Sequence, residues 1–158
     1  MKKISIFVFC IMLIFSVSAW GASQDFKGTV NNITPIGETA WADYFSTSTI
    51  AGWAASPTGY IYYKKIGSMC FIKFKITGTS NADATSFTIP YANYNDFEGY
   101  FSAGNTVDNG TAATTPAAIR IAGNSATIVL YKDLSTANAW TTSGTKTIYG
   151  EFFYEVAP

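Results

Sequence analysis

The densest group of side chains able to bind a polar ligand lies between residues 91 and 101. This stretch reads YANYNDFEGYF, so aromatic rings are interspersed with amides and carboxylates. Rings can cover the apolar face of a sugar while amide and carboxylate groups hydrogen-bond its hydroxyls. The alternative is ordinary packing, in which the rings hold the loop against the domain. The candidate ligand-binding residues of this stretch are Tyr91, Asn93, Tyr94, Asn95, Asp96 and Tyr100.

A second aromatic group lies in the irregular stretch 25–59. Trp41 and Trp53, with Tyr44 between them, are separated mainly by Thr, Ser, Ala and Gly. Both tryptophans are candidate ligand-binding residues. A subunit interface is the competing interpretation, because exposed aromatic residues are enriched in interfaces.

Two other kinds of site fit the sequence less well. Asp96 and Glu98 with a neighbouring asparagine could offer oxygen ligands to calcium, but their spacing is not that of an EF-hand loop. Glycoside hydrolysis needs two carboxylates about 5 to 9.5 Å apart. Glu151 and Glu155 share a strand face, but at roughly 3.3 Å per residue they are about 13 Å apart. We therefore expect no catalytic residues, metal or cofactor.

The composition excludes several functions outright. The 158 residues include no histidine, which rules out Ser-His-Asp and Cys-His catalysis and His-ligated zinc within this chain. The formal net charge is zero, with 10 basic and 10 acidic residues. Binding to nucleic acid is not expected, because it relies on clustered Lys and Arg to neutralise phosphates.

Residues 1–22 have the layout of a secretory signal peptide. A short basic start is followed by the apolar run Ile4–Val17 and then by small residues. The run of about 14 residues is shorter than the roughly 20 of a membrane-spanning helix, so an uncleaved anchor is the less favoured alternative. We expect cleavage near residues 19–22, export to the periplasm or the extracellular space, and no membrane association afterwards.

Cleavage changes the charge and the cysteine count. Loss of Lys2 and Lys3 from the 10 basic residues leaves 8 basic and 10 acidic ones, a net charge near −2. Cys10 is also lost, so Cys70 remains alone and no internal disulfide can form. Because Cys70 lies in an apolar run, we expect a thiol buried in the core.

Short alternating stretches separated by turn residues predict an all-β protein. No segment after the signal shows a sustained 3.6-residue apolar period. We expect one domain, residues 23–158, folded as an antiparallel, jelly-roll-like β-sandwich of seven to nine strands. The clearest strand is Met69–Thr77, which places apolar residues on one face and Lys73 and Lys75 on the other.

The remaining predicted strands follow the same pattern. Gly67-Ser68 is expected to form a hairpin turn, and Asp108-Asn109-Gly110 is expected to form another turn. The last strand is expected to be central, since both of its faces carry large residues. Residues 23–59 either add one edge strand to each sheet or form an arm that packs on a neighbouring subunit. Residues 133–143 form a loop or a single helical turn. The other strands are expected at Tyr60–Ile66, Ser86–Ile89, Glu98–Val107, Ala118–Ala122, Ala126–Lys132 and Thr145–Val156.

One part of the chain resembles a known family. Residues 62–80 read YYKKIGSMCFIKFKITGTS, and the next strand closes with FTIP at 87–90. This resembles C-terminal, receptor-binding modules of bacteriophage tail-fibre and other virion structural proteins, in which Tyr, a basic residue and Gly precede an alternating strand, Gly-Thr-Ser and a strand ending in Pro. Segments 107–110, 118–121 and 143–150 look like the rest of that module, so the likeness covers roughly residues 53–156.

The resemblance implies a compact β-sandwich, often trimeric, at a tip that touches host-surface glycans or proteins. The signal peptide departs from the family, and a secreted or envelope protein with a fibre-tip-like module agrees with both observations. The leading hypothesis is a secreted, non-enzymatic module for surface recognition that binds a cell-surface glycan or protein receptor and assembles as a homotrimer. The alternatives are a self-assembling structural subunit of a virion-like or cell-surface assembly and a carboxylate-based carbohydrate hydrolase.

Overall fold

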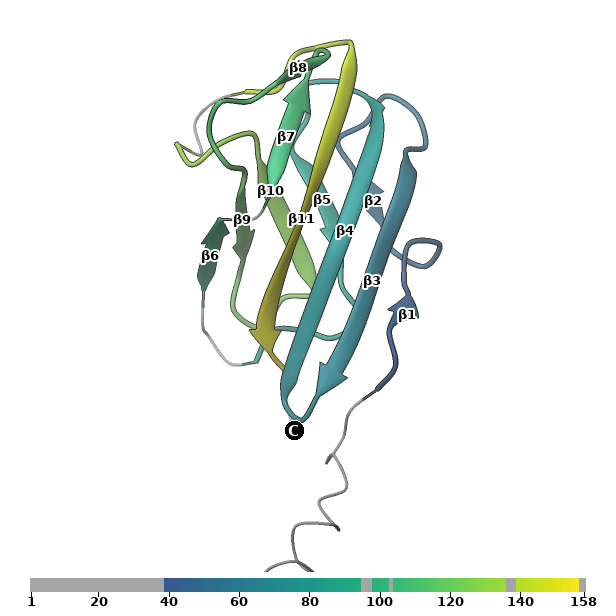
Figure 1. The fold of residues 1–158 in the computed structure, drawn as a ribbon, viewed down its shortest axis with the longest axis vertical. Helices are drawn as coiled ribbons and strands as arrows, with labels where there is room; N and C mark the ends of the chain where they lie inside the picture. Colours follow the sequence, from purple (N-terminus) through teal and green to yellow (C-terminus); the bar gives the residue numbers. More distant parts are fainter. Residues whose placement is uncertain (1–38, 95–97, 103, 136–138, 157–158) are drawn as a thin grey trace, which may run out of the picture. The chain divides into compact units, whose positions relative to one another are not determined.

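Strands with alternating apolar residues make up all of the regular secondary structure in the described part of the chain. A computed structural model describes residues 39–94, 98–102, 104–135 and 139–156. These residues form eleven strands, arranged as two antiparallel sheets that pack against each other (Figure 1). The predicted all-β sandwich is therefore confirmed. The predicted signal peptide, residues 1–22, lies outside the described residues.

The two sheets contain six and five strands. The larger sheet has the order β1 (Ala42–Asp43), β3 (Thr58–Ile66), β4 (Met69–Thr79), β11 (Thr145–Glu155), β7 (Asn105–Asp108) and β8 (Thr111–Ala112). The smaller sheet has the order β2 (Ile50–Ala51), β5 (Thr85–Thr88), β10 (Thr127–Tyr131), β9 (Ala118–Ile121) and β6 (Gly99–Ser102).

The pairing from β4 onward is nested. Strand β4 pairs with β11, β5 with β10, β6 with β9 and β7 with β8. The chain is thus one long hairpin rolled across both sheets, which is the jelly-roll-like feature of the prediction. Its tip is the predicted turn at Asn109-Gly110, where both residues have positive φ, 50° and 76°. The hairpin turn at Gly67-Ser68 and the central position of β11 are also confirmed.

The predicted number of strands, seven to nine, is too low. Three of the eleven, β1, β2 and β8, have only two residues, too few to show an alternating pattern. In addition, the single strand expected at Glu98–Val107 is two strands, β6 and β7, which belong to different sheets. Gly104 makes the crossing between the sheets with a φ of 62°, in the left-handed region that glycine adopts most easily.

The sequence left open whether the segment before β3 forms edge strands or an arm, and residues 39–57 answer this question for the described part. They add one short edge strand to each sheet, since β1 pairs with β3 and β2 pairs with β5. For these residues the first alternative is confirmed. Residues 23–38, the remainder of the proposed arm, lie outside the described residues.

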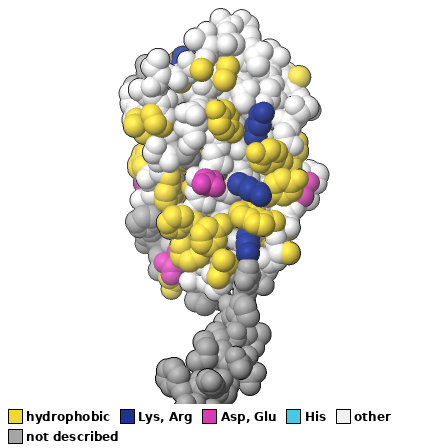
Figure 2. All heavy atoms as spheres, in the orientation of Figure 1, with side chains coloured by type: hydrophobic (Ala, Val, Ile, Leu, Met, Phe, Trp, Pro, Cys, Tyr) yellow, Lys and Arg dark blue, Asp and Glu magenta, His cyan; other side chains and the backbone are white. Residues whose placement is uncertain are grey.

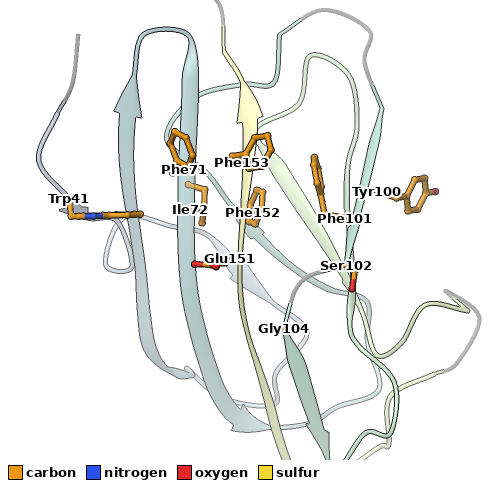
Figure 3. A pocket seen from close by; sticks show the side chains of 10 residues that line it. All are labelled: Trp41, Phe71, Ile72, Tyr100, Phe101, Ser102, Gly104, Glu151, Phe152 and Phe153. Carbon is orange, nitrogen blue, oxygen red and sulfur yellow. The ribbon is translucent and has the colours of Figure 1, made fainter. Parts of the chain in front are cut away.

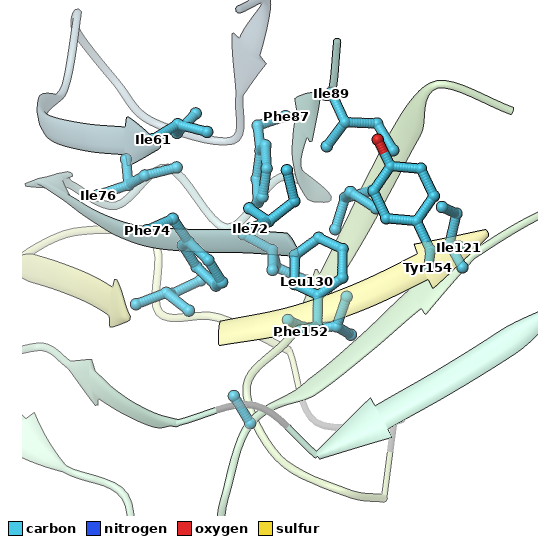
Figure 4. Packing of buried hydrophobic residues seen from close by; sticks show 14 of the residues in the cluster. Ile61, Ile72, Phe74, Ile76, Phe87, Ile89, Ile121, Leu130, Phe152 and Tyr154 are labelled. Carbon is cyan, nitrogen blue, oxygen red and sulfur yellow. The ribbon is translucent and has the colours of Figure 1, made fainter. Parts of the chain in front are cut away.

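The core lies between the sheets and is built from the inward faces of the long strands (Figure 4). On β4 the predicted inward residues, including Cys70 and Phe74, are buried. The ring of Phe74 packs against Phe87 of β5 and Phe152 of β11, with centroids 5.1 and 6.3 Å away. Burying each such side chain stabilises the fold by about 1.5–3 kcal/mol, so the alternation of β4 and β11 is a major source of stability.

One charged side chain lies inside this core. Lys146 of β11 is 0 % exposed, and its ammonium group lies 4.6 Å from the ring centre of Trp53 and 4.9 Å from that of Trp140. Lys146 Nζ donates hydrogen bonds to the Gly52 carbonyl and to Thr85 Oγ1. The two indole rings and the two oxygen atoms thus stabilise the positive charge of Lys146 and offset the free-energy cost of removing it from water.

The burial of Lys146 changes its acid–base behaviour. Desolvation lowers the pKa of its ammonium group to about 8, although Asp108 and Asp83 act in the opposite direction. An unfolded chain keeps the ordinary lysine pKa of about 10.4. Between these two values the unfolded state binds more protons than the folded state, so this group makes stability rise with pH across that interval.

We expect Lys146→Ala to lower the free energy of unfolding by about 2–5 kcal/mol, because it leaves a cavity between two tryptophan rings. Lys146→Met keeps most of the packing and removes the charge, so its cost is smaller. Urea unfolding at pH 7 measures both. Between pH 8 and 10 the wild-type protein should gain stability relative to Lys146→Met. A constant difference between them across that interval would contradict the role of the buried charge.

We expect Gly104→Ala to cost more than about 2 kcal/mol. The left-handed conformation alone costs a non-glycine residue about 1–2 kcal/mol. A Cβ at position 104 would also lie 1.7 Å from the Tyr149 carbonyl oxygen. Gly67→Ala is the matched control, since Gly67 has a similar φ of 58° but nothing within 4 Å of the added atom. Equal losses in urea unfolding would show that the close approach of Gly104 to β11 is unimportant.

Candidate functional site

The outer face of the six-stranded sheet carries an unusual set of exposed aromatic side chains. Because side chains alternate along a strand, the register aligns Tyr62, Lys73 and Glu151 in one row across β3, β4 and β11. The neighbouring row on one side aligns Phe71 with Phe153. Figure 2 shows this face, where hydrophobic side chains surround a few basic and acidic ones.

Trp41, from the short edge segment, lies over this face. Lys73 Nζ is 4.4 Å from the centre of the Trp41 ring and 5.4 Å from that of Tyr62. Tyr62 in turn stacks on Tyr60 with ring centres 5.3 Å apart. These cation–π and stacking contacts hold Trp41 in place while 45 % of it stays exposed.

A groove of about 780 Å³ starts at Trp41 and crosses β4 and β11 toward β6 (Figure 3). Phe71 and Phe153 lie along its middle, and Tyr100 and Phe101 of β6 line its other side. Phe153 is 53 % exposed, so its ring is open to a ligand, whereas the Tyr100 ring points away from the other lining side chains on the opposite side of β6 from Phe101. Glu151 is the one carboxylate among the described residues that line it.

The groove exists because β11 lacks a neighbour along part of one edge. Strand β7 pairs with β11 over Thr147–Tyr149. The next backbone contact along this edge within the described residues is at the other end, where the Tyr94 amide donates to the Glu155 carbonyl. Backbone groups of alternate residues point to the same side of a strand. Those of Glu151 and Phe153 therefore face the groove, and no described strand pairs with them.

A smaller pocket of about 260 Å³ adjoins the groove, since Phe101 and Phe153 line both. Tyr94 lies in this pocket together with Tyr154 and Glu155. Four of the predicted ligand-binding residues, Trp41, Asn93, Tyr94 and Tyr100, therefore line the groove or the adjoining pocket, although the sequence assigned Trp41 to a separate cluster.

The other predicted site residues lie elsewhere. Tyr91 packs edge-on against Tyr63, with ring centres 5.9 Å apart, and its carbonyl accepts a hydrogen bond from Tyr154 Oη. Asn93 lines the smaller pocket, but it is buried and bridges to Val156, so it supports the loop from inside. Asn95 and Asp96 lie outside the described residues. The described part of the loop therefore has exposed rings, as a ligand site needs, and buried side chains that hold it against the domain.

Trp53 is not on the surface. It is 8 % exposed, lies in the core and contacts the Lys146 ammonium group. Gly78, which pairs with Lys146, leaves room for the Trp53 ring, because a Cβ there would lie 2.7 Å from it. The grouping of Trp53 with Trp41 as one ligand or interface cluster is therefore wrong: one ring faces solvent and the other fills the core.

Glu98, a suggested calcium ligand, has another partner. Its carboxylate is 2.5 Å from Arg120 Nε, and this hydrogen bond lowers the pKa of Glu98 and raises the pKa of Arg120. Among the described residues there is no group of three His, Cys, Asp or Glu side chains placed to hold a metal ion.

Phe71, Glu151 and Phe153 line the groove but were not among the site residues predicted from the sequence. The signal was present, because large aromatic residues occupy the outward positions of β4 and β11. It indicated only that β11 is central in its sheet. The groove itself depends on where β7 ends, which no local pattern reveals.

Comparison with known proteins adds no assignment. The chain matches no protein family, and no curated protein is similar to it. Along the described part of the chain no helix has the length and apolar character needed to cross a membrane.

Proposed function

We propose that this protein is a secreted, non-enzymatic module that recognises an extracellular surface by binding a glycan in the groove between Trp41 and Tyr100. The observation that carries the proposal is the groove itself. Aromatic rings at both ends and along the middle could stack on sugar faces. The Glu151 carboxylate and the backbone groups of Glu151 and Phe153 could bond sugar hydroxyls.

The shape and chemistry of the groove favour binding over catalysis. Its volume lies within the usual range of ligand sites, about 300–1,000 Å³. Hydrolysis of a glycosidic bond needs two facing carboxylates, whereas Glu151 is the single carboxylate among the described lining residues. Export, expected from residues 1–22, would bring such a module to cell-surface glycans.

We expect the mature protein to bind a subset of structures on a glycan array. Trp41→Ala and Phe153→Ala should each weaken binding at least about tenfold, equivalent to about 1.4 kcal/mol, because each removes an exposed stacking surface of the groove. Isothermal titration with the best ligand from the array gives the affinities.

Tyr149→Ala is the matched control, since Tyr149 is an exposed aromatic residue on the same sheet but does not line the groove. It should bind like the wild type. Absence of any glycan binding by the wild-type protein, or equal losses in all three variants, would reject the proposal.

A further inference from the structure

The outer face of the six-stranded sheet carries opposite charges on its two central strands. The outward positions of β4 include Lys73 and Lys75, and those of β11 include Glu151 and Glu155. Figure 2 shows basic and acidic side chains near the middle of this face, among hydrophobic ones. Neither Lys73 nor Glu151 belongs to an ion pair of the described residues, so both charges remain available to a partner.

This pattern is complementary to itself under one particular two-fold rotation. The axis lies in the plane of contact, parallel to the strands and midway between β4 and β11. It lays β4 of one copy over β11 of the other. Because the register pairs Lys73 with Glu151 and Phe71 with Phe153, each of these residues then faces its own pairing partner in the other copy. An axis across the strands would instead lay β4 over β4 and bring lysines together.

The same rotation places the Trp41 ring over the groove of the second copy. Trp41 contacts Lys73 of β4 and Tyr62 of β3, so its ring lies on the β3 side of β4. The groove lies on the other side of the axis, at the edge of β11 away from β4. A rotation that exchanges β4 and β11 therefore carries the β3 side of one copy to the groove of the other, next to the exposed Phe153 ring.

The face is large enough for a stable dimer. Strands β4 and β11 have 11 residues each, about 36 Å at roughly 3.3 Å per residue. The combined width of β3, β4, β11 and the groove is about four interstrand spacings, or about 19 Å. The projected area is thus about 700 Å², close to the roughly 800 Å² that each partner buries in an interface of standard size. Sheets packed face to face keep their strands within about 30° of each other, so the register holds near the axis.

We propose that this outer face binds a second copy of the chain, as a two-fold dimer in which β4 of each copy covers β11 of the other. Two ion pairs between Lys73 and Glu151 lie at its centre, the Phe71 and Phe153 rings pack beside them, and Trp41 of each copy closes the groove of the other. The proposal does not depend on glycan binding. Because the dimer covers the groove, self-association and glycan binding compete for one surface, and dilution or ligand releases the monomer.

Charge reversal tests the pairing. Sedimentation equilibrium of the wild-type mature protein should show a dimer at micromolar concentration. Lys73→Glu and Glu151→Lys should each weaken dimerisation at least about 100-fold, because each replaces two attractive contacts by two repulsive ones. An equimolar mixture of the two variants should recover the dimer, since opposite charges then meet at both contacts. Lys75→Glu is the matched control: it makes the same change of charge on β4 but faces Tyr149, so its mixture with Glu151→Lys should not recover the wild-type affinity.

A zero-length cross-link tests the same contact without substitutions. Carbodiimide joins a carboxylate to an amine that touches it, and a mixture of isotope-labelled and unlabelled protein separates links between copies from links within one. We expect cross-linked peptides of Lys73 and Glu151 that carry one label each.

A recovered dimer in the mixture of charge variants and cross-links between copies support the proposal. A wild-type protein that stays monomeric at high micromolar concentration, a trimer, a mixture that stays monomeric, or cross-links confined to one copy would overturn it. Neither measurement needs a glycan, so failure here leaves the glycan proposal standing, and an empty glycan array leaves the dimer standing.

Discussion

The buried ammonium group of Lys146 is the interaction on which one end of the sandwich depends. Through Gly52 and Thr85 it connects the segment after β2 and strand β5 with β11, and through the two indole rings it organises the segments around Trp53 and Trp140. A charge in the interior is tolerated only when such partners surround it. Because Cys70 is the one cysteine among the described residues and is free, non-covalent contacts of this kind connect the segments in place of disulfides.

The two halves of β11 have opposite environments. Near Thr145 the strand has β4 on one side and β7 on the other, and Lys146 points into a closed core. Beyond Tyr149, β7 is no longer beside it, because Gly104 turns the chain into the other sheet. The sandwich therefore opens at one corner, and large side chains such as Phe153 line the opening. One strand thus supplies both the fully buried charge of Lys146 and the exposed aromatic ring of Phe153.

Much of the fold follows from local sequence. Alternation in β4 and β11 identified their inward faces correctly, because a period of two maps directly onto the two sides of a sheet. The buried Cys70 and the turns at Gly67 and Asn109 followed from the same local rules. Local sequence did not separate Trp41 from Trp53, since both are flanked by small or polar residues. Local sequence also gave no sign that Lys146 is buried, because its neighbours Thr145 and Thr147 are typical of a solvent-exposed strand.

The sequence by itself determined the class of the protein: a histidine-free, aromatic-rich β-sandwich with sparse charge. This is so because composition and two-residue periodicity act within a few residues along the chain. Only the tertiary structure decided which rings face solvent and where the aromatic groove forms. Those outcomes depend on contacts between distant segments, such as Trp41 with Lys73 and Gly104 with Tyr149. The groove is a property of sheet register and strand length, so it exists only once both sheets have assembled.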